Sequence, residues 1–424
     1  MTTFPRPHSA ISAVSDSNWK IEHQCPQCSA PVVLDEADRL LSCPFCRTKL
    51  YLVTPDHFRY HIPAPDRISR DLLYLPYWRL KGTSFDVRAE GDIRPRFVDT
   101  SILAATVPGL PRTLGLRPQA MKVKYISPDM PGQFMDTSLL ADAVIPAIDA
   151  SVPMGQSLYR TFIGETISLL YSPAYLEKDT LFDALLKRPL ATWRENEPAR
   201  GPSDARPPNW QIRFIATLCP RCAWDLEGER DSRALICKNC DSVWNCLKTE
   251  FEEVPFSVMT ASTKEPILYL PFWRMKPHVE GFQLSSYADL IRFANLPKAV
   301  NLDFESTPVH FWSPAFKVSP ALFLRWARQM TTFQPDGKTR ESFAGASFHQ
   351  VTLAGQEAVE SMKIILATLA VDKRQIYPKL AEIKITASEL MLVYQPFIVT
   401  SRELIHETMR VTIDRTALNF GTYL

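Results

Sequence analysis

Eight of the nine cysteines fall into two sets with the same spacing, and this repeated pattern constrains the fold more than any other feature of the chain. Each set has two CxxC pairs with fourteen residues between them. A CxxC turn can place two sulfur atoms on one ion, so the second pair must come back to within about 2.3 Å of the same metal. About seven residues per arm suits a β-hairpin. The expected ligands are Cys25, Cys28, Cys43, Cys46, Cys219, Cys222, Cys237 and Cys240.

The two cysteine-rich stretches, CPQC to CPFC and CPRC to CKNC, resemble the transcription-factor-type, rubredoxin-like zinc ribbons that are common in bacterial proteins. The resemblance covers about sixty residues. It implies two structural Zn²⁺ ions, each with four thiolates and no open coordination position. It says little about function, because ribbons occur in polymerase subunits, enzymes and assembly proteins alike.

Other roles for these cysteines are less favoured. Disulfides are not expected, because the chain lacks the basic start and apolar core of a signal peptide and cytosolic thiols are normally reduced. Iron is the main alternative, since tetrahedral sulfur suits both metals. Rubredoxin-like knuckles usually have glycine where this chain has Ser29, Arg47, Ala223 and Asp241, which favours zinc. Cys246 lies outside the pattern and is interpreted as a buried filler.

The length of 424 residues predicts two or more domains. The hydrophobic fraction of 46% and the charged fraction of 22% are typical of a folded soluble protein, and no apolar run approaches the roughly eighteen residues of a membrane span. We therefore expect a cytoplasmic protein. The formal net charge of +2 gives no overall attraction to a phosphate backbone.

The chain also repeats itself outside the cysteine sets. Residues 72–81 (LLYLPYWRLK) and 267–276 (ILYLPFWRMK) are identical at seven of ten positions. A second match pairs residues 169–186 with residues 392–409. The offset grows from 195 to 223 residues between these two matches, which indicates an insertion in the second half.

A third match in sequence lies before the insertion. It pairs Leu110-Pro111, followed by Ile126-Ser127-Pro128, with Leu296-Pro297, followed by Trp312-Ser313-Pro314. The insertion, at about 316–380, is predicted to be helical. Ser319 before Pro320 is a good helix start, with the hydroxyl as cap, and the apolar spacing in GQEAVESMKIILATLA predicts a second helix.

Alternating runs at 84–87, 166–171 and 382–394 predict strands. Pro76, Pro173, Pro271 and Pro396 each follow an aromatic residue and one spacer, and each is expected to mark a strand end, an edge or a bulge. The fold class is therefore α+β, with an internal duplication in which each half is a four-cysteine zinc ribbon followed by a related, mostly antiparallel β-sheet domain. The expected segments are a leader at 1–18, ribbon 1 at 19–53, a β-rich domain at 54–193, a linker at 194–209, ribbon 2 at 210–250 and a second β-rich domain at 251–424.

The repeated aromatic and arginine motif supplies the candidate binding surface. An aromatic ring beside an arginine can stack on a base, surround a cation or hold a carboxylate. The alternative, which we favour, is a core strand with tyrosine and proline on one face and leucine and tryptophan on the other. The six candidates are Tyr74, Trp78, Arg79, Tyr269, Trp273 and Arg274.

No pattern in the sequence predicts catalysis. The chain has no GxGxxG, GxxxxGK[ST], HExxH or GxSxG motif. The favoured hypothesis is a noncatalytic zinc-binding scaffold or protein-interaction protein, with a protein as partner and its halves packed as a pseudo-dimer. One alternative is a nucleic-acid-binding ribbon protein associated with transcription or replication. Another is a rubredoxin-like iron electron carrier.

Overall fold

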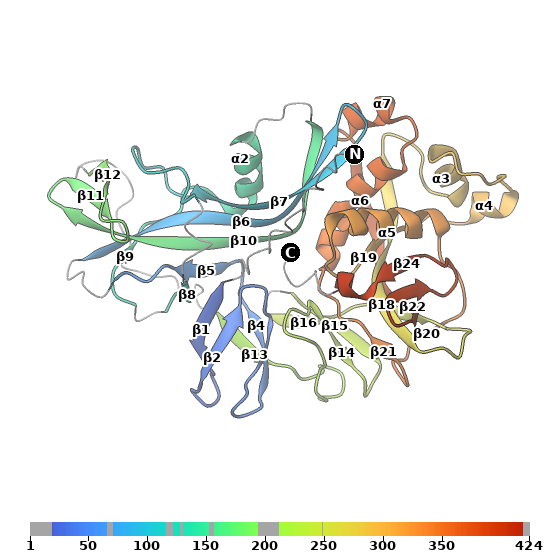
Figure 1. Cartoon of the computed structure of the whole chain (residues 1–424), viewed down its shortest axis with the longest axis horizontal. Coiled ribbons are helices and arrows are strands. Elements are labelled where there is room, and N and C mark those ends of the chain that lie inside the picture. The colour runs from blue at the N-terminus through green and yellow to red at the C-terminus, as the bar shows by residue number, and fades with distance from the viewer. Residues whose placement is uncertain are drawn as a thin grey trace, which may run out of the picture.

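The computed structural model describes residues 19–65, 71–115, 122–127, 130–151, 157–193, 212–247 and 249–418. The predicted leader at 1–18 and linker at 194–209 lie outside these residues. Most of the regular secondary structure in the described chain is β-strand, largely antiparallel, with a few helices. Figure 1 shows an elongated sheet on one side, a sheet with helices on the other and small strands of both cysteine sets below them.

The first large sheet has eight strands. Its centre is the long antiparallel pair of β6 and β10, and β5 runs parallel to β10. These strands cover the runs that the sequence predicted at 84–87 and 166–171. The eight strands are β5 Phe58–His61, β6 Leu72–Arg88, β7 Ile93–Leu103, β8 Lys124–Tyr125, β9 Gln133–Phe134, β10 Ser157–Glu177, β11 Thr180–Asp183 and β12 Pro189–Thr192.

The second large sheet also has eight strands. Its centre is the antiparallel pair of β18 and β22, and β17 runs parallel to β22. The strands are β17 Phe256–Met259, β18 Ile267–Glu280, β19 Phe311–Pro314, β20 Thr339–Arg340, β21 Ser347–Phe348, β22 Lys384–Val399, β23 Glu403–His406 and β24 Thr412–Asp414.

The four prolines do not end strands, so the expected strand end was wrong, whereas the expected edge describes the surroundings of Pro76. Each lies inside one of the long central strands. Pro76 shows the reason. The Pro76 carbonyl accepts a hydrogen bond from the Ala104 N–H, and the Pro76 nitrogen points to the same side of β6 as this carbonyl. On that side β7 ends at the pairing of Leu103 with Tyr77, and β9 begins to pair only at Tyr74. Proline therefore costs no ladder bond, because it occupies the gap between two neighbouring strands.

Helices occupy the predicted insertion and also an earlier segment that sequence reasoning missed. Helix α5 begins at Pro320 as expected, although Ser319 makes no side-chain cap hydrogen bond. Helix α3 has a capping box, in which Ser286 and Asp289 bond each other's backbone N–H groups. The helices are α2 Val144–Ser151, α3 Tyr287–Phe293, α4 Leu302–Ser306, α5 Pro320–Phe333, α6 Gly355–Leu369 and α7 Lys373–Ile376, with 3₁₀ turns η1 Ala141–Ala143 and η3 Tyr377–Lys379.

The remaining strands belong to the cysteine-rich segments. β1 pairs with β2, and β3 pairs with β4, which also pairs with β13 from the second half of the chain. β14, β15 and β16 form a separate three-stranded sheet. Their bounds are β1 Lys20–Gln24, β2 Pro31–Asp35, β3 Leu40–Ser42, β4 Lys49–Val53, β13 Arg213–Ala216, β14 Ala234–Cys237, β15 Ser242–Leu247 and β16 Glu250–Glu253.

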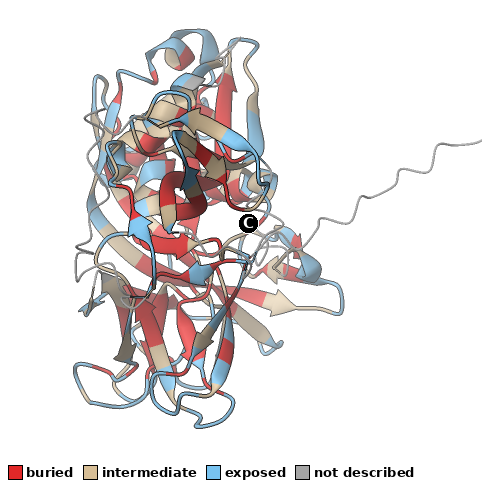
Figure 2. Cartoon of the chain, turned by 90° about the vertical axis from the view of Figure 1, so that its left-hand side faces the viewer, coloured by how far each residue is buried: buried red, intermediate tan, exposed pale blue. Residues whose placement is uncertain are grey.

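The largest hydrophobic cluster joins the two halves. It consists mainly of second-half residues but includes Phe85, Val87 and Ile163 from β6 and β10. Helix α6 lies at this junction, because it contacts β10 of the first sheet and β18 and β22 of the second. Figure 2 shows buried residues in the interior and exposed loops at the lower end.

Among the residues that the structure describes, no helix is both long and apolar enough to cross a membrane.

Candidate metal centres

The first four cysteines come together at the ends of two hairpins. The first CxxC turn joins β1 to β2, and the second joins β3 to β4. The sulfur atoms of Cys25 and Cys46 are 3.8 Å apart, and those of Cys28 and Cys43 are 3.7 Å apart. All four sulfurs lie within 4.8 Å of one another.

The second four cysteines have the same arrangement. The Cys219 and Cys240 sulfurs are 3.6 Å apart, and those of Cys222 and Cys237 are 3.5 Å apart. A disulfide would require about 2.05 Å. Four sulfurs at about 2.3 Å from one tetrahedral ion are about 3.8 Å from each other. Both tetrads therefore fit a four-thiolate metal centre and are consistent with zinc ribbons.

Each CxxC turn is closed by a residue in the left-handed backbone region. These residues directly follow the second cysteine of each pair, and their φ angles are 59° at Ser29, 62° at Arg47, 58° at Ala223 and 48° at Asp241. In the first turn the Ser29 N–H donates to the Cys25 carbonyl at 2.8 Å. The left-handed region is the one that glycine adopts most readily. The knuckle therefore keeps the glycine conformation although none of the four residues is glycine.

Burial and local hydrogen bonds give the thiols of each tetrad different pKa values. Hydrogen bonding with the Thr48 hydroxyl lowers the pKa of Cys46 to about 6, and Asn239 lowers the pKa of Cys222 to about 6. Burial, followed by the hydrogen bond to Cys222, raises the pKa of Cys237 to about 12. The thiolate is the form that binds a metal, so a cation would have to displace a proton from a thiol with a raised pKa such as Cys237.

The two cysteine-rich units pack against each other. The Tyr51 hydroxyl of the first donates to the Ser232 carbonyl of the second at 3.0 Å, and β13 pairs with β4. A hydrophobic cluster contains Leu40 and Tyr51 from the first unit and Leu235 and Trp244 from the second. The buried Cys219 and Cys237 belong to this cluster, so the second metal site borders the contact between the units.

The aromatic and arginine motif lies largely in the interior. Five of its residues are at most 5% exposed: Tyr74, Trp78, Arg79, Tyr269 and Trp273. Tyr74 and Trp78 pack in the same cluster, so tyrosine and tryptophan share a face of β6, contrary to the expected alternation. The indole Nε1 of Trp78 donates to the Leu139 carbonyl at 2.8 Å, and that of Trp273 donates to the Leu353 carbonyl at 2.9 Å.

The two arginines of the motif have different surroundings. Arg79 binds Asp99 through two nitrogens, at 2.8 and 2.9 Å, and donates to Glu36 at 2.6 Å. Its guanidinium also lies 3.8 Å from the centre of the Trp19 ring. Glu36 and Trp19 belong to ribbon 1, so Arg79 fixes that ribbon to β6 and β7. Arg274 is half-exposed, and its Nη2 contacts the Met391 sulfur at 3.3 Å.

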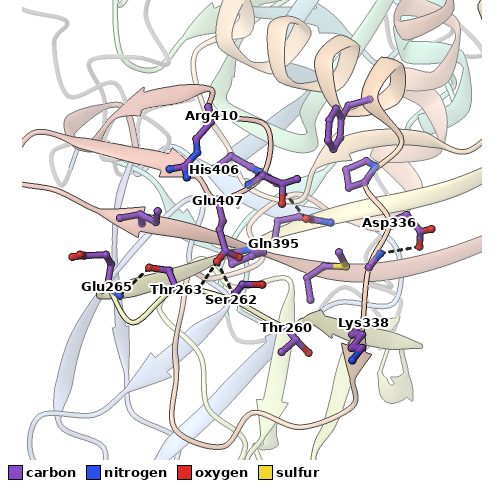
Figure 3. A pocket seen from close by; sticks show the side chains of 17 residues that line it. Thr260, Ser262, Thr263, Glu265, Asp336, Lys338, Gln395, His406, Glu407 and Arg410 are labelled. Carbon is purple, nitrogen blue, oxygen red and sulfur yellow. Dashed lines mark hydrogen bonds between the residues drawn. The ribbon is translucent and has the colours of Figure 1, made fainter. Parts of the chain in front are cut away.

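An open pocket of about 730 Å³ lies between the end of β17, the loop after α5 and the turn after β23 (Figure 3). At its floor, the His406 Nδ1 accepts hydrogen bonds from the Thr408 and Met409 N–H groups. Its Nε2 therefore carries the proton and faces the Gln395 Oε1 at 3.3 Å. Burial lowers the pKa of His406 to about 4.

Sequence reasoning missed this pocket, because its lining comes from segments that are far apart in the chain. No described residue bonds the Gln395 Nε2, although the side chain is fully buried. A lone glutamine in a strand and a lone histidine before a turn carry no pattern. One sequence signal could have pointed to His406. The alignment of residues 392–409 with 169–186 matches His406 with Asp183, and Asp183 also accepts backbone N–H groups in a turn.

Comparison with protein-family models, with curated proteins and with solved structures found no match to this chain.

Proposed function

We propose that the chain is a noncatalytic zinc-binding scaffold built from two copies of one module, a four-cysteine ribbon followed by a β-sheet domain, that presents surfaces to a protein partner. The observation that carries the proposal is the presence of two four-sulfur tetrads, the second of which borders the contact between the two halves. Four thiolates leave a metal no position for water or substrate, so each ion would stabilise the fold. Residues 19–193 and 210–424 would be the two copies.

The strand pairings support duplication of the sheet domain. In the first sheet β10 pairs antiparallel with β6 and β11 and parallel with β5, while β9 runs parallel to β6. In the second sheet β22 pairs antiparallel with β18 and β23 and parallel with β17, while β21 runs parallel to β18. Two unrelated sheets have no reason to share both the order and the direction of these pairings.

Individual hydrogen bonds agree at the residue level. The Ala104 N–H donates to the Pro76 carbonyl at 2.9 Å, and the Ala315 N–H donates to the Pro271 carbonyl at 3.0 Å. Each alanine carbonyl in turn accepts two successive backbone N–H groups, from residues 138–139 and 352–353 respectively. The same bonds therefore surround the repeated motif in both halves.

One sequence landmark was matched incorrectly. Trp273 pairs with Ser313 of β19, whereas Trp78 pairs with Ile102 of β7. The segment Trp312-Ser313-Pro314 is therefore equivalent to residues 101–103 and not to Ile126-Ser127-Pro128. Helices α3 and α4 lie between β18 and β19, so the second copy carries extra residues before β19 as well as after it.

Zinc is the metal that suits a structural role, because it has no redox chemistry. The residues after each second cysteine do not distinguish zinc from iron, since they hold the left-handed conformation that glycine would provide. The test is metal analysis with absorption spectroscopy. We expect two zinc ions per chain and a colourless protein. A red protein containing iron would replace the zinc proposal with a rubredoxin-like one.

Cysteine variants test the assignment of ligands. Cys237→Ser should lower the zinc content from two ions to one and melt the second ribbon, since metal binding contributes on the order of 10 kcal/mol to folding in ribbon peptides. The matched control is Cys246→Ser, which lies outside both tetrads and should keep both ions. Equal zinc content in the two variants would contradict the assignment.

The repeated motif is poorly suited to be the partner surface, because five of its six candidate residues are buried. Aromatic residues at the ribbon tips are better suited, because Phe45 and Trp224 are 64% and 59% exposed. The double variant Phe45→Ser, Trp224→Ser should lose a partner that copurifies with the wild-type chain and should keep both zinc ions. Leu302→Ser, at an 87% exposed position on α4, is the control. Retention of the partner by the double variant would exclude the ribbon tips.

A further inference from the structure

A second cavity lies where the two halves meet. Its volume is about 290 Å³, and its lining comes from β4, β10, β15 and the start of α6. These elements belong to ribbon 1, the first sheet, ribbon 2 and the second β-rich domain. The residues on which the argument rests are Arg39, Arg233, Ala354 and Glu357.

Arg39 is a buried cation without an acidic partner. Its side chain is 7% exposed, and its Nη1 donates to the backbone carbonyls of Glu36 and Asp38 at 3.1 and 2.8 Å. Among the described residues no carboxylate forms an ion pair with it, and the adjacent Asp38 is paired with Arg230. A buried guanidinium normally has an acidic partner, because an isolated buried charge is costly.

Arg233 lines the same cavity. Its side chain has no hydrogen bond or ion pair to any residue in the described part of the chain, and its backbone N–H donates to the Val351 carbonyl at 2.7 Å. Arg39 and Arg233 each precede the third cysteine of their set by four residues. Burial, followed by repulsion from Arg233, lowers the pKa of Arg39 to about 10. Two like charges therefore meet in one cavity.

The N-terminus of α6 adds a third positive group. Ala354 is the N-cap of this fifteen-residue helix and supplies no side-chain cap hydrogen bond. The first N–H groups of a helix have no partner within the helix, and the helix dipole places partial positive charge there. Ala354 lines the cavity, so this end of α6 lies at its wall.

The acidic residues of the lining do not balance these charges. Asp56 is held by two nitrogens of Arg59 at 2.8 Å each. Glu357 interacts with Lys317 and Arg233, its Oε2 has no hydrogen-bond partner among the described residues, and burial raises its pKa. One carboxylate with a raised pKa thus shares the lining with two arginines and a helix terminus.

We propose that this cavity binds a small dianionic oxyanion of the phosphate type, held between Arg39, Arg233 and the first N–H groups of α6. The donors come from three different elements and therefore approach the ligand from different directions. A tetrahedral phosphate offers oxygen atoms in those directions, whereas a planar carboxylate offers two in one plane. The ligand would join the four units that line the cavity. This inference goes beyond the scaffold function and does not depend on the identity of the metal.

The test uses the full-length, metal-loaded protein and inorganic phosphate as the probe in isothermal titration calorimetry. Arg39→Gln and Arg233→Gln should each weaken binding about tenfold, since each removes one charge-assisted contact. Glu357→Gln should strengthen binding, because it removes the one opposing charge. The matched control is Arg221→Gln, whose side chain is 50% exposed and pairs with Glu253, and it should leave the affinity unchanged.

Several results would overturn the proposal. They are absence of phosphate binding by the wild-type protein, unchanged affinity in both arginine variants, weaker binding by Glu357→Gln, and tighter binding of succinate than of phosphate. Metal content is measured on every variant, so a misfolded protein is recognised. If Arg39→Gln fails to fold, Arg233→Gln decides, because the Arg233 side chain is only half-buried and forms no hydrogen bond or ion pair with a described residue.

Discussion

The two arginines of the repeated motif show how identical residues take different roles. Arg79 is 1% exposed and paired with Glu36 and Asp99, which are 4% and 5% exposed. Removing one partner of such a group leaves uncompensated buried charges, which costs about 3–5 kcal/mol. Arg274, at the matching position of the repeated motif, forms no ion pair with any described residue, although its charge acts on Glu389.

Arg79→Ala should therefore lower the free energy of unfolding by about 3–5 kcal/mol and loosen ribbon 1 from the first sheet. Arg274→Ala should cost less than about 1 kcal/mol. Denaturant unfolding measures both values, and hydrogen exchange in residues 19–53 reports the loosening. Equal losses in the two variants would show that the ion-pair network around Arg79 does not stabilise the fold.

Buried histidines make stability depend on pH. Burial lowers the pKa of His406 to about 4, below the ordinary value of 6.5. Between these values the unfolded chain binds a proton that the folded chain does not. Stability is therefore highest above pH 6.5 and is lost as the pH falls toward 4, with a slope of at most about 1.4 kcal/mol per pH unit.

His406→Asn should remove this one contribution. The asparagine oxygen can still accept the backbone N–H groups of the turn, as Asp183 does from Leu185 and Leu186. We expect a shallower loss of stability between pH 6.5 and 4 than in the wild type, measured by urea unfolding at several pH values. The cysteines contribute equally to the pH dependence of the wild type and the variant, so their contribution drops out of the difference between the two curves. Parallel curves would mean that His406 has the same pKa in the folded and the unfolded chain.

At the level of single elements, the long central strands tolerate proline only at defined positions. Pro173 lies in β10 between the residues that pair with β5 and those that pair with β11, and its carbonyl accepts from the Ala184 N–H. The next residue back, Ser172, pairs with Leu75 of β6 and faces the opposite side.

Pro173→Ala should therefore change stability by less than about 1 kcal/mol. Ser172→Pro should cost about 3 kcal/mol or more, because it removes a hydrogen bond at the centre of the sheet. Denaturant unfolding compares the two variants directly. A neutral Ser172→Pro would show that the ladder bond to β6 is not required.

The same elements show what a sequence can predict. The spacing of the cysteines predicted both tetrads, because ligand geometry leaves few alternatives, and alternation predicted β6, β10 and β22. The prediction that the prolines end strands failed, because the positions where proline is tolerated depend on where the neighbouring strands end. No local sequence pattern encodes those ends. Helix α3 was missed, although its capping box of Ser286 and Asp289 is a local signal. Pockets depend on residues that only tertiary structure brings together, such as Gln395 and His406.

At the level of the whole molecule, the two halves are joined by contacts that do not need a covalent connection. β13 of the second half pairs with β4 of the first, and both ribbons contribute to one hydrophobic cluster. Near α6, Phe85 of β6 packs against Phe323 of α5, with ring centres 6.3 Å apart. Lys373 donates to the Gly91 carbonyl at 2.6 Å.

These contacts predict that the halves stay together after the chain is cut within residues 194–209. A site for a specific protease can be inserted there, because the cut leaves β13 on the second piece and β4 on the first. After cleavage both pieces should elute together in gel filtration, at the position of the intact 48.2 kDa chain, and separate only in denaturant. Tyr51→Ala removes the hydrogen bond to the Ser232 carbonyl and should promote separation, whereas Leu302→Ala should not. Separate elution of the wild-type pieces in native buffer would show that the halves are held together mainly by the covalent chain, since the buried clusters would then be too weak to bind them.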